Sequence, residues 1–330
     1  MAATGAVRLV FVGTGGIAKT HATAARGIEG VCVVAAVDPN PATLDSFTGS
    51  HGAPGFASFD EALTLIGDGE LGADAVVVCA PPNIRRSVVE PSLERGLAVL
   101  VEKPLASTPD EARALAGLAR SGGPATAVGY CHRFVPALLE MKRRLETGDL
   151  GRLTRFENTF AFHHPGMASA WFSDPAVSGG GSFLDTGCHS LDIFQFLVGS
   201  PERVAVLTDH AWPGRGESSA TALFRAGSGP HAGVAGVIQA GWLESTRFRV
   251  RLVGTEATFV YDYERPEVLL RLSNTGEREE LAVETHEVRF ARQLEAFAGA
   301  VREGKPAGEA GLADFADGLV VAEAAGNPSG

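Results

Sequence analysis

The sequence has few of the features that mark secreted, membrane or zinc-binding proteins. Its 330 residues include four cysteines, and no two of them form a CxxC pair or a tight cluster. Disulfide scaffolds and zinc knuckles need such clusters, so reduced and partly buried thiols are expected. No apolar run approaches the roughly 20 residues of a transmembrane helix. The first residues contain no charged leader, and we therefore expect a cytoplasmic protein without a signal peptide.

Positive charge is also scarce, with 28 Lys and Arg residues against 39 Asp and Glu residues and a net charge of -11 at pH 7. No Lys- or Arg-rich stretch stands out, which argues against a nucleic-acid partner. Histidine and cysteine do not show the spacing of metal ligands, so no metal is expected. Apolar residues are plentiful, at 45% of the chain, which suits a large core in about two domains.

Short apolar runs alternate with helical patterns in the first part of the chain. Near-continuous Val, Leu and Ala runs are typical of strands that are buried on both faces of a parallel sheet. The runs cover residues 7–13, 31–37, 74–80, 97–102 and 125–130. The last helical pattern covers 108–122, with Thr108 as its expected N-cap and Pro109 at its first position. This order predicts a doubly wound α/β domain over residues 1–127.

The pattern changes in the second part of the chain, residues 128–330. Residues 246–253 and 257–264 alternate in character, which predicts antiparallel strands with one buried face and one open face. In the first segment Phe248, Val250 and Leu252 share one face, and Arg247, Arg249 and Arg251 share the other. We interpret the arginine row as a solvated face or, alternatively, as a subunit interface. Helical patterns over 286–304 and within 309–326 close the chain.

A glycine-rich turn follows the first predicted strand and precedes a helical pattern. Gly13-x-Gly15-x-x-Ala18 matches the dinucleotide-binding fingerprint, and Asp38 ends the next strand about 20 residues later, as that fingerprint requires. The helix N-terminus would bind the pyrophosphate, and Asp38 would bind the ribose hydroxyls. A carboxylate repels a 2′-phosphate, which favours NAD over NADP. The alternative is a glycine turn with a capping aspartate and no cofactor. The expected cofactor-binding residues here are Gly13, Thr14, Gly15, Gly16, Ile17, Ala18 and Asp38.

Four further motifs carry a family resemblance. They are CAPPN (79–83), VEKPLA (101–106), VGYCHRF (128–134) and GGGSFLDTGCHSLD (179–192). Together with the glycine-rich turn, and in this order, they resemble the Gfo/Idh/MocA oxidoreductases, typified by glucose-fructose oxidoreductase and inositol dehydrogenase. The resemblance implies a Rossmann domain followed by an α/β domain with an open-faced, mostly antiparallel sheet. It also implies hydride transfer between a nicotinamide cofactor and a secondary alcohol or ketone of a small polyhydroxylated substrate, a sugar or cyclitol.

The resemblance also assigns roles to individual residues. The family's catalytic lysine falls on Lys103, and its acid–histidine pair falls on Asp185 and His189. Residues that border the nicotinamide and its ribose fall on Pro81, Pro82, Asn83, Glu102 and Lys103. Segments that border the substrate pocket in relatives include Tyr130, Arg133, His163 and Trp171, with His132 and His164 beside them. The sequence departs from the family pattern at Arg86, often a histidine, and at Cys131-His132, where Asn or Arg usually precedes the RF pair.

The stretch GGGSFLDTGCHSLD has two interpretations. In a structural one, Ser182 caps a helix with Asp185 three residues later, as in a capping box, and His189 is a half-buried helix histidine. A cap does not need three glycines, whereas a positive φ or a close approach of the backbone to a ligand does. In the catalytic one, Asp185 and His189 share a helix face at i, i+4. His189 is then the general acid/base, Lys103 polarises the substrate oxygen, and Asp185 orients the histidine.

Two other functions stay open on the sequence alone. The first is a family member that keeps NAD tightly bound and recycles it in a redox-neutral glycoside cleavage, elimination or epimerisation. The second is a non-catalytic dinucleotide or sugar sensor, which would not need Lys103, Asp185 and His189 together. For assembly, the open-faced sheet with its arginine row favours a homodimer or homotetramer formed through that sheet.

Overall fold

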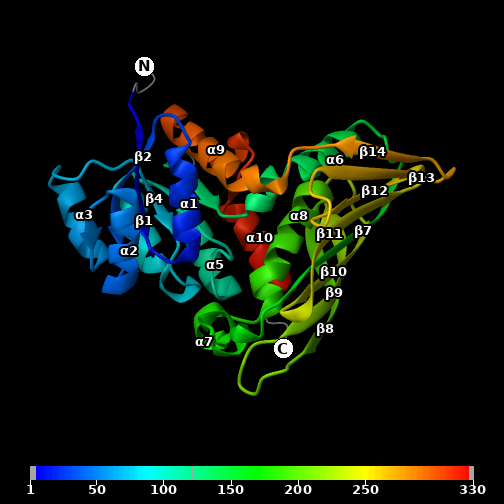
Figure 1. The fold of residues 1–330 in the computed structure, drawn as a ribbon, viewed down its shortest axis with the longest axis horizontal. Helices are drawn as coiled ribbons and strands as arrows, with labels where there is room; N and C mark the ends of the chain where they lie inside the picture. Colours follow the sequence, from blue (N-terminus) through cyan, green and yellow to red (C-terminus); the bar gives the residue numbers. More distant parts are fainter. Residues whose placement is uncertain (1–4, 120–121, 327–330) are drawn as a thin grey trace. The chain divides into compact units, whose positions relative to one another are not determined.

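The computed structural model describes residues 5–119 and 122–326, which form two compact units (Figure 1). The first unit contains the chain through Ala106, then Asp110–Tyr130 and Phe290–Gly318. The second contains Ser107–Pro109, Cys131–Arg289 and the chain from Leu319. The change of unit after Tyr130 lies close to the expected boundary at 127/128. The later return of Phe290–Gly318 to the first unit left no signal in the sequence.

A mostly parallel sheet of seven strands forms the core of the first unit, in the order β15-β6-β5-β4-β1-β2-β3. The strands are β1 (Val7–Val12), β2 (Val31–Val37), β3 (Gly55–Phe56), β4 (Ala75–Val78), β5 (Ala98–Val101), β6 (Thr126–Val128) and β15 (Ala313–Asp314). β15 pairs antiparallel with β6, and the other described pairings are parallel. The helices that belong largely to this unit are α1 (Gly16–Arg26), α2 (Pro41–His51), α3 (Phe59–Gly67), α4 (Arg86–Glu94), α5 (Pro109–Ala116) and α9 (Arg289–Glu303).

The doubly wound α/β fold predicted from the sequence is confirmed. β2 and β3 lie on one side of β1, and β4, β5 and β6 lie on the other, so the strand order reverses beside β1. In open α/β sheets, ligands bind outside the carboxyl ends of the strands at such a point. The helix expected over 108–122 is shorter than predicted. It begins at Pro109 as expected but ends at Ala116, because Gly117 follows and glycine is a poor helix former.

The second unit contains a sheet of eight strands in the order β14-β13-β12-β11-β7-β10-β9-β8. The strands are β7 (Leu153–His163), β8 (Ser200–Asp209), β9 (Ser219–Ser228), β10 (Ala235–Gly241), β11 (Leu243–Gly254), β12 (Ala257–Asp262), β13 (Val268–Ser273) and β14 (Arg278–Ala282). β10 and β7 pair parallel, and the other described pairings are antiparallel, so the mostly antiparallel sheet is confirmed.

Two helices, α6 (Pro136–Glu146) and α8 (Cys188–Leu197), cover one face of the eight-stranded sheet (Figure 1). α7 (Pro175–Ser178) precedes the glycine run, and α10 (Phe315–Ala325) ends the described chain. Single 3₁₀ turns lie at Pro82–Ile84, Cys131–Phe134, Pro165–Ser169, Trp171–Ser173, His286–Val288 and Ala307–Ala310.

The other face of the eight-stranded sheet is open. Along β11 the apolar residues predicted to face inward are buried, and the arginines that alternate with them are only partly covered. Arg249 pairs with Asp262 of β12 at 2.6 Å, and Arg251 pairs with Glu157 of β7. Acidic partners on the two neighbouring strands therefore neutralise much of the arginine row.

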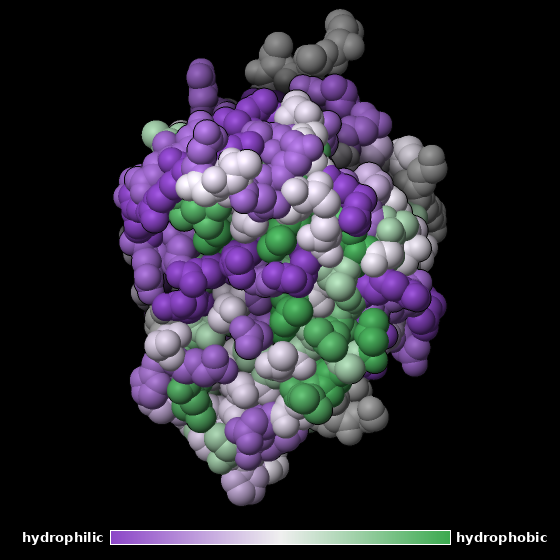
Figure 2. Space-filling view, turned by 90° about the vertical axis from the view of Figure 1, so that its right-hand side faces the viewer, coloured by the Kyte–Doolittle hydropathy of each residue, from purple (hydrophilic) through white to green (hydrophobic). Residues whose placement is uncertain are grey.

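Apolar side chains also lie on this open face. Leu207 of β8 and Leu223 of β9 are exposed, and Leu223 stands opposite Val237 of β10 in the sheet register. Figure 2 shows hydrophobic and hydrophilic residues gathered in neighbouring patches. The face therefore combines ion-paired charges with accessible apolar area.

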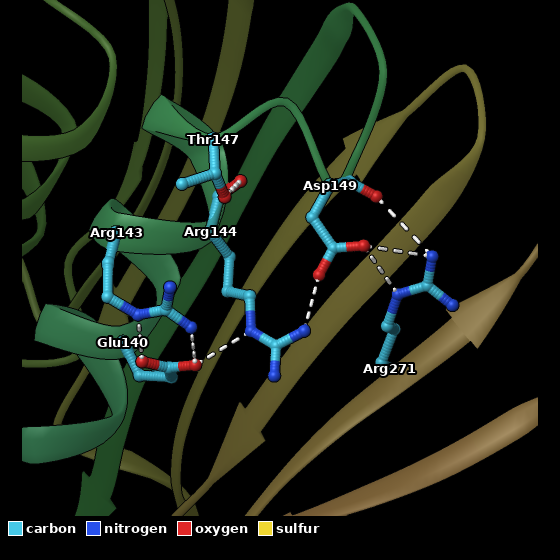
Figure 3. Close-up of polar contacts among 6 residues, drawn as sticks. All are labelled: Glu140, Arg143, Arg144, Thr147, Asp149 and Arg271. Atoms are coloured by element: carbon cyan, nitrogen blue, oxygen red, sulfur yellow. Dashed lines mark hydrogen bonds and ion pairs between the residues drawn. The ribbon is translucent and has the colours of Figure 1, made fainter.

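A network of charged side chains fixes α6 to the sheet (Figure 3). Glu140 accepts hydrogen bonds from Arg143 and Arg144, and Arg144 also donates to Asp149. Arg271 of β13 donates to the other oxygen of Asp149 at 3.0 Å. The hydrogen bond from Arg143 is the main cause that lowers the pKa of Glu140 to about 2, and Arg144 adds to it against the effect of burial. The carboxylate is therefore ionised at neutral pH and holds both arginines.

Candidate functional site

Gly13 follows β1 in a conformation that favours glycine. Its φ is +86°, and a Cβ atom there would lie 2.8 Å from backbone atoms of Cys79 and Ala80, just after β4. A side chain is therefore excluded both by the dihedral angle and by the neighbouring chain segment. The tight turn expected at Gly13 is formed.

The first turn of α1 presents backbone rather than side chains. Gly15 is the N-cap of α1, and a Cβ atom on Gly15 or Gly16 would meet no atom of the described residues within 4 Å. Ala18 is fully buried, which lets the helix pack closely on the sheet. The positive end of the helix dipole and the open space over the two glycines suit the pyrophosphate of a dinucleotide. The chain from Gly13 to Ala18 thus fits the cofactor expected from the sequence.

Asp38 lies beside this turn, at the end of β2. Its Oδ2 accepts hydrogen bonds from the backbone N–H and the hydroxyl of Thr14, at 2.8 and 2.9 Å. Its Oδ1 accepts a hydrogen bond from the backbone N–H of Asn40 at 2.9 Å. These bonds fix the carboxylate and still leave lone pairs that can accept the ribose hydroxyls of a bound cofactor.

The ends of β4 and β5 supply the other expected cofactor residues. Pro81, Pro82 and Asn83 follow β4, and Glu102 and Lys103 follow β5. β4 pairs parallel with both β1 and β5, so these segments and the glycine-rich turn lie at one edge of the sheet. Lys103 is half-buried, and the Lys103–Pro104 peptide bond is cis. This is the edge at which ligands bind in doubly wound folds.

Glu102 anchors the backbone at Lys103. Its Oε1 lies 2.7 Å from Nε2 of the buried His21, and its Oε2 accepts a hydrogen bond from the Lys103 N–H at 3.1 Å. Burial raises the pKa of the Glu102 carboxyl, but the hydrogen bond with His21 and the charges of His21, Lys103 and Arg85 outweigh it. The pKa therefore lies below its usual range. Sequence reasoning missed His21, because nothing distinguishes it within the helical pattern.

Arg85, another residue that sequence reasoning missed, joins the two strand ends. It is only 2% exposed. Its guanidinium donates hydrogen bonds to the backbone carbonyls of Ala80, Lys103 and Pro104. Arg86, the departure from the family pattern, instead lies exposed on α4 and pairs with Glu90 at 3.2 Å. Two adjacent arginines look alike in a sequence, and burial alone separates their roles.

The glycine run 179–181 is required by contacts with the protein's own backbone. Gly179 has a φ of +87°, and a Cβ atom there would lie 1.8 Å from the carbonyl oxygen of Ser107. A Cβ atom on Gly181 would lie 2.2 Å from the carbonyl oxygen of Glu217. The sequence predicted a positive φ or a close approach to a ligand. The structure has the positive φ, and the close approach is to neighbouring segments of the chain.

Glu217 caps the helical segment that follows the glycine run. Its Oε1 accepts hydrogen bonds from the backbone N–H groups of Gly181 and Phe183, at 3.0 and 2.9 Å. Burial raises the pKa of Glu217 despite these bonds. Ser182, the expected cap, makes no side-chain hydrogen bond with the described residues, so the capping-box interpretation is wrong. A cap supplied from a distant segment leaves no local signal in the sequence.

Asp185 and His189 lie on turns of different helical geometry. Asp185 is within a single π-helical turn, Phe183–Gly187, and His189 is in the first turn of α8. The regular α-helical spacing expected between them is therefore interrupted. Trp242 Nε1 donates a hydrogen bond to Asp185 Oδ2 at 3.1 Å, and His189 Nδ1 lies 3.2 Å from His132 Nδ1. Isolated π turns occur frequently at functional sites.

The four expected substrate residues differ in exposure. Tyr130 is buried just after β6. The Arg133 guanidinium donates to both oxygens of Asp192 in a buried ion pair, at distances from 2.7 to 3.0 Å. His163 is exposed at the end of β7, and Trp171 is exposed and stacks on the adjacent phenylalanine at 3.8 Å. Arg133 is thus bound by the protein itself, whereas His163 and Trp171 have accessible surface.

Within residues 5–119 and 122–326, no three His, Cys, Asp or Glu side chains are grouped as a metal site would require. In that part of the chain, every helix is too short or too polar to span a bilayer. None of the four cysteines, all of them described, is joined in a disulfide.

Comparison with known proteins assigns both parts of the chain. A family model described as an oxidoreductase family with an NAD-binding Rossmann fold matches residues 7–130. A second model, described as a GFO/IDH/MocA C-terminal domain, matches residues 138–260. Together the two matches cover most of the chain, in the order of its two main segments.

Individual relatives agree with these matches. The rhizopine catabolism protein MocA of Rhizobium meliloti is 31% identical over 192 residues, which are 58% of this chain and only 57% of that protein. Inositol 2-dehydrogenase of Rhizobium meliloti (strain 1021) is 26% identical over 323 residues, 94% of each chain. The solved structure of levoglucosan dehydrogenase in complex with NADH has a TM-score of 0.85 at 19% identity, covering 96% of this chain and 95% of that one. At that identity the match shows the shared fold.

Proposed function

This chain belongs to the Gfo/Idh/MocA family of oxidoreductases, and from that premise we propose that it transfers a hydride between a nicotinamide cofactor and a secondary alcohol or ketone of a sugar, sugar derivative or cyclitol. The observation that carries the proposal is the anchoring of Lys103. Glu102 and Arg85 hold its backbone at the sheet edge that also carries the glycine-rich turn. A cation at that edge can stabilise negative charge on a substrate oxygen near the bound cofactor.

NAD is the proposed cofactor. The chain from Gly13 to Ala18 would hold its pyrophosphate, and Asp38 would hold the adenosine ribose. The segments after β4 and β5 would border the nicotinamide and its ribose. When bound, the nicotinamide ring supplies the acceptor or donor of the hydride. The Asp38 carboxylate is fixed by Thr14 and opposes a 2′-phosphate, which supports NAD over NADP.

We propose Lys103, Asp185 and His189 as the catalytic residues. In the oxidation direction, His189 accepts the proton of the substrate hydroxyl, and Lys103 donates a hydrogen bond to the same oxygen. Asp185, which Trp242 holds, is the proposed orienting carboxylate and acts through the helical segment that also carries His189. In the reduction direction His189 returns the proton to the carbonyl oxygen.

The proposed substrate is a small polyhydroxylated ring. The names of inositol 2-dehydrogenase and levoglucosan dehydrogenase support this class. His163 and Trp171, with their accessible surface, are proposed substrate contacts, and Tyr130 and Arg133 are proposed to shape the pocket. We propose a cytoplasmic location, because a chain without disulfides suits a reducing compartment.

The test is an assay of purified protein that has been stripped of bound nucleotide. NAD or NADP is added with pools of inositols, aldoses, sugar acids and nucleotide sugars, and nicotinamide absorbance is followed. We expect stoichiometric reduction with one pool, faster with NAD than with NADP. Tight cofactor binding without any change in its redox state, together with product formation, would instead identify a redox-neutral reaction with recycled NAD.

Two lysine variants test whether Lys103 takes part in the reaction. Lys103→Met should lower kcat by at least about 100-fold while NAD still binds, because the transition state loses a charged donor. Lys305→Met is the matched control, since Lys305 is exposed and pairs with Glu303 at the surface. Full activity in Lys103→Met would overturn the assigned mechanism.

We also propose that the open face of the eight-stranded sheet joins copies of the chain into a homodimer or homotetramer. The accessible leucines and the ion-paired arginines support this. Leu223→Asp should lower the mass measured by light scattering, because it places a charge within that face. Leu139→Asp, at an exposed position on α6, is the control. A wild-type protein that is monomeric at all concentrations would contradict the proposal.

A further inference from the structure

We propose that His132 is the positioning residue that selects the working tautomer of His189, an inference that rests on the proposed role of His189 as general acid/base. His132 stands where the family pattern usually has Asn or Arg. It lies in the 3₁₀ turn Cys131–Phe134, far from His189 in sequence. Both residues belong to the second unit.

The geometry of the pair limits which of its ring nitrogens can carry a proton. The two Nδ1 atoms are 3.2 Å apart, and both residues are buried, with 3% and 7% exposure for His132 and His189. A hydrogen bond between two imidazole nitrogens needs a proton on one and a lone pair on the other. If both Nδ1 atoms carried a proton, two N–H groups would face each other, so the pair binds one proton between them. In the neutral pair, the tautomer of one histidine therefore fixes the tautomer of the other.

Aromatic packing holds the His132 ring in place. Phe248 stacks on it at 4.9 Å, and the edge of Phe160 meets it at 5.4 Å. Tyr263 contacts Phe248 in a tilted arrangement, with ring centroids 4.2 Å apart, and stacks on His286 at 3.6 Å. This packing leaves His132 little freedom to turn its Nδ1 away from His189.

Several ionisable groups surround the pair, and the two carboxylates among them are fixed by other partners. From the helical segment of His189 come Asp185, bonded to Trp242, and Asp192, bonded to Arg133. From the segment of His132 comes Cys131, whose Sγ lies 3.9 Å from His132 Nδ1. Beyond β12 come Tyr263, whose pKa is raised by burial, and His286, whose pKa is lowered by burial.

The proposed chemistry decides the direction of the hydrogen bond. A general base needs a lone pair on the nitrogen that takes the substrate proton. If His132 donated its Nδ1–H, neutral His189 would carry its own proton on Nε2 and could not act as a base there. His132 must therefore accept, with its proton on Nε2, and His189 Nδ1–H must donate. When the substrate O–H bond breaks and His189 Nε2–H forms, the same Nδ1–H bond becomes charge-assisted and stronger.

The first experiment reads the tautomers directly and needs no activity. The full chain is labelled with ¹⁵N-histidine, and the His132 and His189 signals are assigned by comparison with His132→Asn and His189→Asn. At a pH where the pair is neutral, we expect protonated Nδ1 and bare Nε2 on His189, with the reverse on His132. A protonated Nε2 and bare Nδ1 on His189 would overturn the inference.

The second experiment compares pH profiles of kcat and kcat/KM in wild type, His132→Asn and His132→Phe. The Phe variant keeps a ring but has no acceptor. We expect its kcat to fall about 10- to 100-fold, as for other residues that orient a reacting group, with a smaller change in KM. Its acid limb should move to lower pH by about one unit, because the protonated His189 loses its acceptor and releases its proton more easily.

His132→Asn is the rescue variant, because its side-chain oxygen can replace Nδ1 as acceptor. It should keep the wild-type acid limb and most of kcat. Equal losses in both variants with an unmoved acid limb would show that His132 serves packing alone and would overturn the inference.

Different results would contradict the proposed function and the proposed role of His132. Full activity in His189→Asn, or no nicotinamide-linked activity in wild type with any substrate pool, would defeat the proposed function, and the ¹⁵N spectra would still decide the tautomer. An inactive His189→Asn together with the opposite tautomer in wild type would defeat the role of His132 alone.

Discussion

The Glu217 carboxylate accepts a hydrogen bond from the backbone N–H of Gly181 at 3.0 Å, and the Glu217 carbonyl oxygen lies where a Cβ atom of residue 181 would point, at 2.2 Å. One residue thus caps the segment that carries Asp185 and His189 and also excludes any side chain at its start. The glycine run and the distant glutamate therefore act together to fix the position of this segment.

Gly181→Ala should destabilise the fold and misplace this segment. The added Cβ atom would meet backbone, which cannot move away as a side chain end can, and overpacking of this kind costs about 1–3 kcal/mol. Gly180→Ala is the control, because its Cβ atom would meet the Leu184 side chain at 3.3 Å. Urea unfolding and turnover should both show the larger loss in Gly181→Ala. Equal losses would mean that the Glu217 contact does not determine the position of the segment.

Glu217→Gln tests how the buried carboxyl group of Glu217 makes the stability of the fold depend on pH. Burial raises the folded-state pKa of Glu217 above its ordinary value of 4.5. The contribution of Glu217 to the free energy of unfolding is fully present below its pKa in the unfolded chain. It is lost as pH rises through its pKa in the folded protein. The free energy of unfolding of wild type, measured relative to Glu217→Gln, should therefore fall as pH rises above 4.5. Glu244→Gln, at an exposed position, is the matched control. A rise of that difference with pH would contradict the assignment.

The parts of the site that the sequence could predict are local. Gly13, Gly15 and Asp38 belong to one βαβ unit, so the spacing of the residues already encodes their geometry. Arg85 and Glu217 act on segments that are distant along the chain, and Glu217 is 36 positions from Gly181. Such contacts exist only once the chain has folded, and no local sequence pattern predicts them.

The same distinction applies to the fold. Alternation along 246–253 predicted the strand and both of its faces, because the side-chain period of a strand is local. The parallel pairing of β10 with β7 depends on which strands meet in the folded sheet. His132 was visible in the sequence only as a departure from the family pattern, and its contact with His189 appears only in the structure.

Asp38→Asn should weaken discrimination against NADP. The amide retains an acceptor oxygen for Thr14 and removes the negative charge that opposes a 2′-phosphate. We expect the preference for NAD over NADP, measured as the ratio of kcat/KM values, to fall about tenfold, equivalent to about 1.4 kcal/mol. Asp45→Asn, exposed on α2, removes a charge of the same sign elsewhere and should leave the ratio unchanged. An unchanged ratio in Asp38→Asn would show that Asp38 does not discriminate between a ribose 2′-hydroxyl and a 2′-phosphate.

Arg85→Met should disturb Lys103 without touching it chemically. The variant keeps an apolar stem of similar length but leaves the carbonyl oxygens of Ala80, Lys103 and Pro104 without their buried donor. Loss of a buried hydrogen-bonding charge costs about 2–4 kcal/mol, and the freed segment should also lower kcat and NAD affinity. Arg86→Met is the natural control, because it removes the adjacent guanidinium from an exposed pair with Glu90. Its unfolding free energy should change by less than about 1 kcal/mol, and its NAD affinity by calorimetry should match wild type. If the two variants behaved alike, the CAPPN and VEKPLA segments would be held together by strand pairing alone, and Arg85 would have no positioning role.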